Sequence, residues 1–333
     1  MQLPVERRVS GRIRKPGLDV IRGLLVLLVM IGHCLELYSR ENFLTWFGFG
    51  FRMPLFIGMA GYLFNLDAAR GGSTADLFAR YRNRLIVPWL FACAFHILTA
   101  QPLSWLTPLE AVIRPPFHLW FVPVIMLYFL IAQRCGLSRT RMLVLSVPAS
   151  LAAMYLFGVG HAIEQFGAWV PDRRYFTFLL YFAFGMWIAE RTLTARWALM
   201  TLPVSAVGFL WWSGLFDSPA PLAEVAAQLL ATLPLIALLP VVAEWPLPFP
   251  VLRMMGKDSL YFYLWHPFAF ALLMLTGMPA IPMMLFAITA LLLVRWAVRR
   301  MPLARLLVGI LPPSIIERRQ HAGDIRLIPE SAT

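Results

Sequence analysis

The chain has 333 residues, of which 60% are hydrophobic and only 14% are charged. Soluble domains carry about 45–50% apolar and about 25% charged residues, so this composition excludes an ordinary soluble protein. The net charge of +12 would indicate nucleic acid as a partner of a soluble protein. Here the basic residues lie between apolar segments, where the cytoplasmic excess of Lys and Arg explains them, and we expect no nucleic-acid partner.

Apolar segments long enough to cross a bilayer, about 20 residues each, follow one another along the chain. They predict ten spans, at 18–37, 45–66, 85–100, 117–133, 142–159, 175–190, 198–216, 222–243, 259–276 and 280–298. Their short connections indicate one membrane domain over 17–300, between a basic N-terminal segment at 1–16 and a basic tail at 301–333. The predicted fold is therefore all-α, a polytopic membrane helix bundle.

The distribution of basic residues orients this bundle. With the N-terminus in the cytoplasm, the inner segments carry 23 Lys and Arg residues and the outer loops carry 4, which is a strong positive-inside signal. Both termini are therefore predicted to be cytoplasmic. The first apolar run follows a basic segment but has no small-residue cleavage pattern, so we expect a membrane helix there and no removed signal peptide.

Ionisable side chains inside a membrane helix cost about 2.5–3.5 kcal/mol on insertion scales, and the first span has the densest set. Asp19 and Arg22 can pair at i, i+3, as can His33 and Glu36. Arg22 and His33 are eleven residues apart, which puts them within about 20° of one helix face and about 16 Å apart along the axis. Snorkelling alone would explain Arg22, but a histidine in lipid points to function.

Two further groups flank later spans. Arg80, Arg82 and Arg84 precede the third span, where arginine forks suit phosphate binding, although an ordinary positive-inside flank explains them equally well. No Gly-rich phosphate loop accompanies them. His118 and Trp120 open the fourth span, where an aromatic belt explains the tryptophan without function and the histidine could line a cavity.

A polar stretch opens the ninth span. Asp258 or Ser259 could cap this helix, and His266 follows Ser259 by seven residues, about two turns along one face. His96 and His161 have no comparable context, and we interpret them as structural. The three cysteines give no disulfide framework and no zinc spacing, and we expect no bound metal.

These residues resemble a known family. Arg22, ten intervening residues and His33 resemble the R-x10-H signature of the membrane acyltransferase-3 family, which includes bacterial O-acetylases and O-succinylases of surface polysaccharides. Further blocks resemble the family in the same order, so that the resemblance covers about residues 15–300: 84–88, 118–121 and 256–266. Two positions depart from the family pattern, because Tyr81 stands where an R-x-x-R pair begins and Ala60 stands where a serine is usual.

The resemblance implies transfer of an acyl group, acetyl or succinyl, from cytoplasmic acyl-CoA to a hydroxyl at the outer side, usually on a glycan. The predicted catalytic residues are His33, as general base or as an acyl carrier, and Arg22. The predicted donor-binding residues are Asp19, Arg82 and Arg84. The predicted acceptor-binding residues are Glu36, His118, Trp120, Ser259 and His266.

The expected partners are small molecules and lipid. Acyl-CoA, acetyl-CoA in the first instance, is a co-substrate and no permanently bound cofactor is expected; the resemblance places the chain in a bacterial inner membrane. The alternative is a membrane transporter or flippase of a small anionic or glycan substrate, because charged residues also mark transport pathways. The sequence shows no inverted repeat, which many transporters have. The acceptor, the acyl group and the oligomeric state stay open.

Overall fold

The computed structural model describes residues 15–39, 42–100, 107–115, 118–161, 171–191 and 199–312, with residues 194 and 196. Regular structure in these residues is helical, and no strand occurs among them, as the all-α prediction requires. The chain divides into two compact units, unit 1 (Met1–Arg70 and Val124–Ser259) and unit 2 (Gly71–Pro123 and Leu260–Thr333). Most of the predicted segments 1–16 and 301–333 lies outside the described residues.

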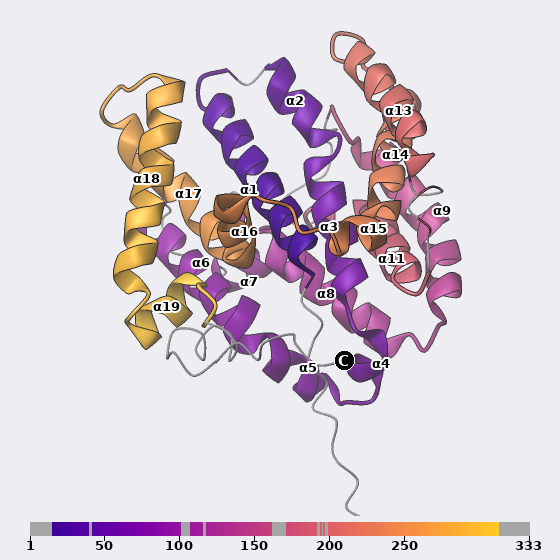
Figure 1. The fold of residues 1–333 in the computed structure, drawn as a ribbon, viewed down its shortest axis with the longest axis horizontal. Helices are drawn as coiled ribbons and strands as arrows, with labels where there is room; N and C mark the ends of the chain where they lie inside the picture. The colour runs from indigo at the N-terminus through magenta and orange to yellow at the C-terminus, as the bar shows by residue number, and fades with distance from the viewer. Residues whose placement is uncertain are drawn as a thin grey trace, which may run out of the picture. The chain divides into compact units, whose positions relative to one another are not determined.

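Unit 1 is built from two stretches of the chain that are far apart in sequence (Figure 1). Its helices are α1 (Pro16–Glu36), α2 (Phe43–Phe49), α3 (Arg52–Leu63), α4 (Leu66–Arg70), most of α8 (Phe121–Arg134), α9 (Arg139–Phe157), α10 (Arg174–Thr177), α11 (Leu179–Ile188), α13 (Leu202–Gly214), α14 (Pro221–Ala237), α15 (Leu239–Ala243) and α16 (Pro250–Lys257). Unit 2 contains α5 (Thr74–Tyr81), the π-helical turn η1 (Arg82–Ile86), α6 (Val87–Ala100), α7 (Thr107–Ile113), α17 (Ser259–Met274), α18 (Ala280–Val298) and α19 (Pro302–Val308).

Four segments of the described chain are long and apolar enough to cross a membrane: Pro16–Glu36, Phe43–Leu63, Arg139–Phe157 and Ala280–Val298. They coincide with four predicted spans. Shorter apolar helices overlap three others: Phe121–Arg134, Pro221–Ala237 and Ser259–Met274. The described helices therefore agree with a multi-pass membrane protein, while the count of ten spans and the cytoplasmic termini stay predictions.

Some predicted spans are interrupted. The span predicted at 222–243 is two helices, α14 and α15, because Pro240 has no N–H to donate to the carbonyl of Ile236. The span predicted at 45–66 divides into α2 and α3, and the span predicted at 175–190 divides into α10 and α11. Apolar composition predicts the presence of these segments but not the breaks within them.

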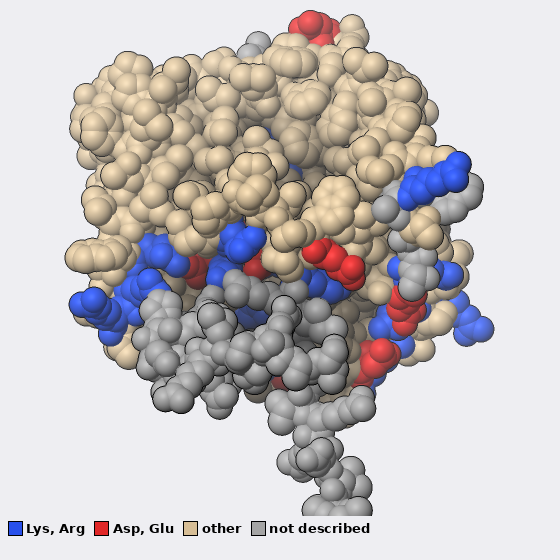
Figure 2. All heavy atoms as spheres, viewed as in Figure 1, with Lys and Arg blue, Asp and Glu red and all other residues tan. Residues whose placement is uncertain are grey.

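Many large apolar side chains are exposed on the surface of both units. Leu210 and Leu222 in unit 1 and Leu275, Ile281 and Trp296 in unit 2 are each at least 71% exposed. Broad stretches of the face drawn in Figure 2 carry no charged side chain. Water-soluble monomers rarely expose contiguous apolar patches of this kind, so lipid is the solvent that this surface suits.

Glycines let helices of unit 1 cross at backbone contact. A β-carbon on Gly256 of α16 would overlap the carbonyl oxygen of Asp19 on α1, and one on Gly23 of α1 would overlap the carbonyl of Leu252. Helices α3 and α11 cross in the same way at Gly61. The crossing of α1 and α16 brings the polar stretch before α17 against the first predicted charged pair.

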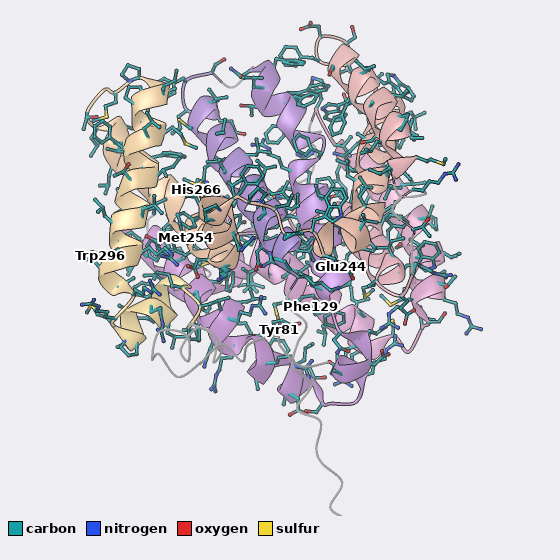
Figure 3. All side chains as sticks on the ribbon, viewed as in Figure 1. Tyr81, Phe129, Glu244, Met254, His266 and Trp296 are labelled. Atoms are coloured by element: carbon teal, nitrogen blue, oxygen red, sulfur yellow. The ribbon has the colours of Figure 1, made fainter. Side chains whose placement is uncertain are left out.

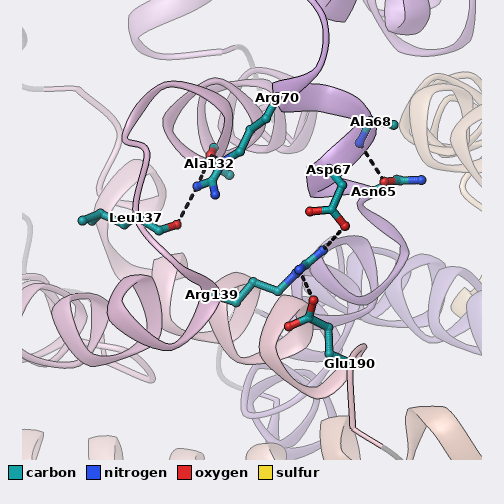
Figure 4. Close-up of polar contacts among 8 residues, drawn as sticks. All are labelled: Asn65, Asp67, Ala68, Arg70, Ala132, Leu137, Arg139 and Glu190. Atoms are coloured by element: carbon teal, nitrogen blue, oxygen red, sulfur yellow. Dashed lines mark hydrogen bonds and ion pairs between the residues drawn. The ribbon is translucent and has the colours of Figure 1, made fainter.

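Charged side chains fasten the ends of several unit 1 helices (Figure 4). Arg139 pairs with Glu190 and with Asp67, the latter at 3.2 Å. Arg70 on α4 donates to main-chain carbonyls at and just beyond the C-terminal end of α8, at 3.1 and 2.6 Å. Because carbonyls at a helix C-terminus carry partial negative charge, Arg70 stabilises that end of α8.

Candidate functional site

Both charged pairs predicted on the first span are present on α1. Arg22 Nη1 lies 3.6 Å from Asp19 Oδ1 and donates to the carbonyl oxygen of Gly256 at 3.4 Å. His33 Nδ1 lies 3.0 Å from Glu36 Oε2. All four side chains are only partly exposed, between 15% and 33%. Since α1 is one continuous helix, the two pairs are about 16 Å apart along its axis.

The contact with Glu36 sets the tautomer of His33. A carboxylate oxygen only accepts, so Nδ1 of the neutral imidazole donates and Nε2 keeps its lone pair. A carboxylate that holds Nδ1–H in this way orients the ring and stabilises the imidazolium, as in hydrolase triads. His33 Nε2 is therefore equipped to take a proton from a hydroxyl.

Arg52, to which the sequence analysis gave no role, is buried beside this pair. Its side chain is 5% exposed, and it donates from Nη1 to Leu28 O at 2.7 Å and from Nη2 to Thr45 O at 3.2 Å. A β-carbon on Gly32 or on Gly48 would overlap the guanidinium. A charge inside the second predicted span was the sequence signal that could have identified it.

A second histidine–glutamate pair lies in unit 1. His161 Nδ1 is 2.5 Å from Glu224 Oε1, and the N–H groups of Gly160 and His161 donate to Oε2 at 3.1 and 3.2 Å. Glu224 is 1% exposed, and Trp46 packs against the His161 ring with 5.9 Å between centroids. His161 therefore has a structural role, because it joins the segment after α9 to Glu224 on α14.

Three buried histidines meet in unit 2. The ring centroids of His118 and His266 are 5.0 Å apart, and those of His96 and His118 are 6.1 Å apart. His266, labelled in Figure 3, lies on α17 and its Nδ1 donates to the Phe262 carbonyl at 2.8 Å. Nε2 of neutral His266 is then an acceptor. The position of His96 beside His118 was not predicted, because His96 was interpreted as structural.

The turn that carries His118 is held by two aromatic side chains. Tyr263 donates to the carbonyl oxygen of His118 and accepts from the N–H of Phe121 at 3.3 Å. Trp89 Nε1 donates to Leu119 O at 2.8 Å. Residues from three separate parts of unit 2 thus fix the orientation of this turn.

The predicted donor-binding arginines of unit 2 lie on an irregular turn. Arg82 and Arg84 are exposed on the π-helical turn η1, where Val87 N–H bonds to the carbonyl of Arg82. Pro88 follows and has no N–H for the carbonyl of Arg84, which favours the wider turn. Such turns frequently lie at functional sites.

The predicted site residues thus form two groups. Asp19, Arg22, His33 and Glu36 share α1 in unit 1, and Ser259, partly buried, is the last residue of that unit. The rest belong to unit 2: Arg82, Arg84, His118, Trp120 and His266. Trp120 is 5% exposed and lies beside His118 in sequence. Within the described residues no group of three His, Cys, Asp or Glu side chains is arranged to hold a metal ion.

Comparisons with known proteins identify the family of the chain. The model of the acyltransferase domain family matches residues 15–300. The nodulation protein NolL of Sinorhizobium fredii (strain NBRC 101917 / NGR234) is 33% identical over 107 residues, which cover 27% of this chain and 27% of that relative. No solved structure matches. Because the family model covers most of the chain, the protein belongs to this acyltransferase family of multi-pass membrane proteins.

Proposed function

We propose that the protein is an O-acyltransferase that moves an acyl group, acetyl in the first instance, from cytoplasmic acyl-CoA to a hydroxyl of a cell-surface or exported glycan. We place it in a bacterial inner membrane. Family membership supports acyl transfer, and the 23 to 4 distribution of basic residues supports a cytoplasmic donor side.

One observation supports this chemistry: Nδ1 of His33 is hydrogen-bonded to Glu36, and His33 lies on the same helix as Arg22. In the proposed reaction His33 Nε2 takes the proton of the acceptor hydroxyl as its oxygen attacks the thioester carbonyl carbon. The carbon–sulfur bond then breaks, and the imidazolium returns the proton to the coenzyme A sulfur. In a two-step variant Nε2 itself attacks the thioester and carries the acyl group to the hydroxyl.

The separation of the two pairs on α1 fits the shape of the donor. Coenzyme A carries its phosphates at one end and its thioester at the other. With about 16 Å between them along the helix, Arg22 and His33 suit the two ends of one donor. Arg22, positioned by Asp19 and by the Gly256 carbonyl, would bind the phosphate end with its planar fork.

The remaining predicted residues take supporting roles in the proposal. Arg82 and Arg84 are exposed cations and would attract the donor phosphates from the cytoplasm. His118 and His266, whose rings lie 5.0 Å apart, would bind hydroxyls of the acceptor. Trp120, two residues after His118, and Ser259, seven residues before His266, would assist them.

The test is mass spectrometry of surface glycans from a deletion strain that carries the wild type, His33→Ala or Cys34→Ala. Cys34 is buried next to His33 on α1 and controls for damage to the helix. We expect an acyl mass increment that is lost on deletion and returns with the wild type and Cys34→Ala only. Full restoration by a normally abundant His33→Ala would refute the role of His33, and no acyl change in any surface fraction would refute a glycan acceptor.

A further inference from the structure

We propose that Arg52 is a positioning residue for the pair of His33 and Glu36, because it holds the α1 turn before His33 and supplies a positive charge to Glu36. This inference rests on the proposed function, in which His33 is the base.

Burial of Arg52 in an apolar segment costs free energy. The residue opens α3 within the apolar segment Phe43–Leu63 and is 5% exposed. An arginine at such depth is expensive and normally serves a function. The competing explanation is that Arg52 only holds α1 against α2 and has no effect on His33. A matched control variant distinguishes these two explanations.

The surroundings of Arg52 are shaped for a guanidinium. Gly48 and Gly32 leave the space that it fills, and Gly32 immediately precedes His33. Arg52 Nη1 donates at 2.7 Å to the carbonyl of Leu28, which lies one helical turn before Gly32. The guanidinium therefore binds the turn of α1 that precedes His33.

The positive charge of Arg52 also acts on the carboxylate of Glu36. Glu36 Oε2 bonds His33, while Oε1 is buried and accepts no hydrogen bond within the described part of the chain. Burial penalises a carboxylate that no charge compensates, and Arg52 interacts electrostatically with Glu36. Arg52 thus supplies a positive charge near the carboxylate that accepts from Nδ1–H of His33.

The experiment compares Arg52→Lys, Glu36→Gln and their double variant with the wild type in purified, detergent-solubilised protein. Arg70→Lys is the matched control, because Arg70 also donates to two main-chain carbonyls of unit 1 but belongs to a separate network (Figure 4). The readouts are kcat, KM for acetyl-CoA, the melting temperature, and the rate at which diethyl pyrocarbonate modifies His33, followed by mass spectrometry.

We expect Arg52→Lys to lower kcat by about 10- to 100-fold, the effect of a misplaced catalytic group, with KM within about twofold of the wild type. The melting temperature should match that of Arg70→Lys, which should keep its kcat. The double variant should be no slower than the slower single variant, because Arg52 acts through Glu36. A wild-type kcat in Arg52→Lys would overturn the proposal. A double variant whose loss of kcat equals the product of the losses in the two single variants would also overturn it.

Two further measurements keep the test decisive. If Arg52→Lys does not fold, Gly48→Ala crowds the guanidinium without removing it and carries the same expectation. If the wild type transfers no acyl group at all, the proposed function fails, yet the modification of His33 still reports on Arg52. Severalfold slower modification in Arg52→Lys than in Arg70→Lys supports positioning, and equal rates overturn it.

Discussion

The crossing of α1 and α16 yields a quantitative prediction for Gly256→Ala. A β-carbon there would lie 2.6 Å from the carbonyl carbon of Asp19 and 2.9 Å from the nitrogen of Gly23. Ordinary contacts need about 3.5–4.0 Å, and the carbonyl oxygen of Asp19 is nearer still, so the helices must separate by more than about 1 Å. Alanine gains about 1 kcal/mol of helix propensity over glycine, but overpacking costs about 1–3 kcal/mol, and the Arg22 hydrogen bond to Gly256 O weakens.

We therefore expect Gly256→Ala to be less stable than the wild type by about 1–2 kcal/mol and to lose about 100-fold in kcat/KM, because separation of the helices moves Arg22 away from the donor phosphates that it is proposed to bind. Thermal unfolding in detergent and an acyl-transfer assay measure the two effects. Gly214→Ala is the control, since Gly214 ends α13 and a β-carbon there meets nothing within 4 Å. A Gly256→Ala protein that melts and turns over like Gly214→Ala would refute the reasoning.

Three further predictions concern single polar contacts. Glu224→Gln should lower the melting temperature, because it replaces the buried charge that His161 bonds, a contact worth about 1.5–3 kcal/mol. Tyr263→Phe should destabilise unit 2 by about 1–3 kcal/mol, since a buried carbonyl and a partly buried N–H lose their hydrogen bonds to the hydroxyl. Hydrogen bonds from the backbone and side chain of Ser73 lower the pKa of Asp76 below its ordinary value, so Asp76 stabilises α5 at neutral pH and loses this effect as the pH falls through its folded pKa. An acid titration of Asp76→Asn should show less destabilisation between pH 7 and the acid range than the wild type, and equal pH profiles would contradict the assignment.

The long apolar helices were the most predictable part of the fold. The spans predicted at 18–37 and 142–159 match α1 and α9 within three residues at each end, and the span at 280–298 matches α18 at both ends. These segments are uninterrupted, so length and hydropathy define them. The short helices α5, α7, α16 and α19 were not predicted, because seven or eight residues are too few for a periodic pattern to stand out.

Contacts within one helix were also predictable, and contacts between helices were not. The spacing of His33 and Glu36 on α1 was enough to predict their hydrogen bond. The bond of Arg52 to Leu28 joins residues 24 apart, and the pair of His161 and Glu224 joins residues 63 apart. Such pairs depend on how the helices pack, and a single sequence carries no record of that.

Several arginines of unit 1 have their N–H groups satisfied by main-chain carbonyls. Four of them donate to main-chain carbonyl oxygens of helices or helix ends: Arg22, Arg52, Arg70 and Arg173. A carbonyl satisfies the donors of a guanidinium without cancelling its charge, whereas a carboxylate cancels it. Arg22 also forms an ion pair with Asp19 at 3.6 Å, which orients its guanidinium. Because Asp19 positions Arg22 in the proposed function, Asp19→Asn should raise KM for acyl-CoA, and a KM equal to that of the wild type in a steady-state assay would contradict this role of Asp19.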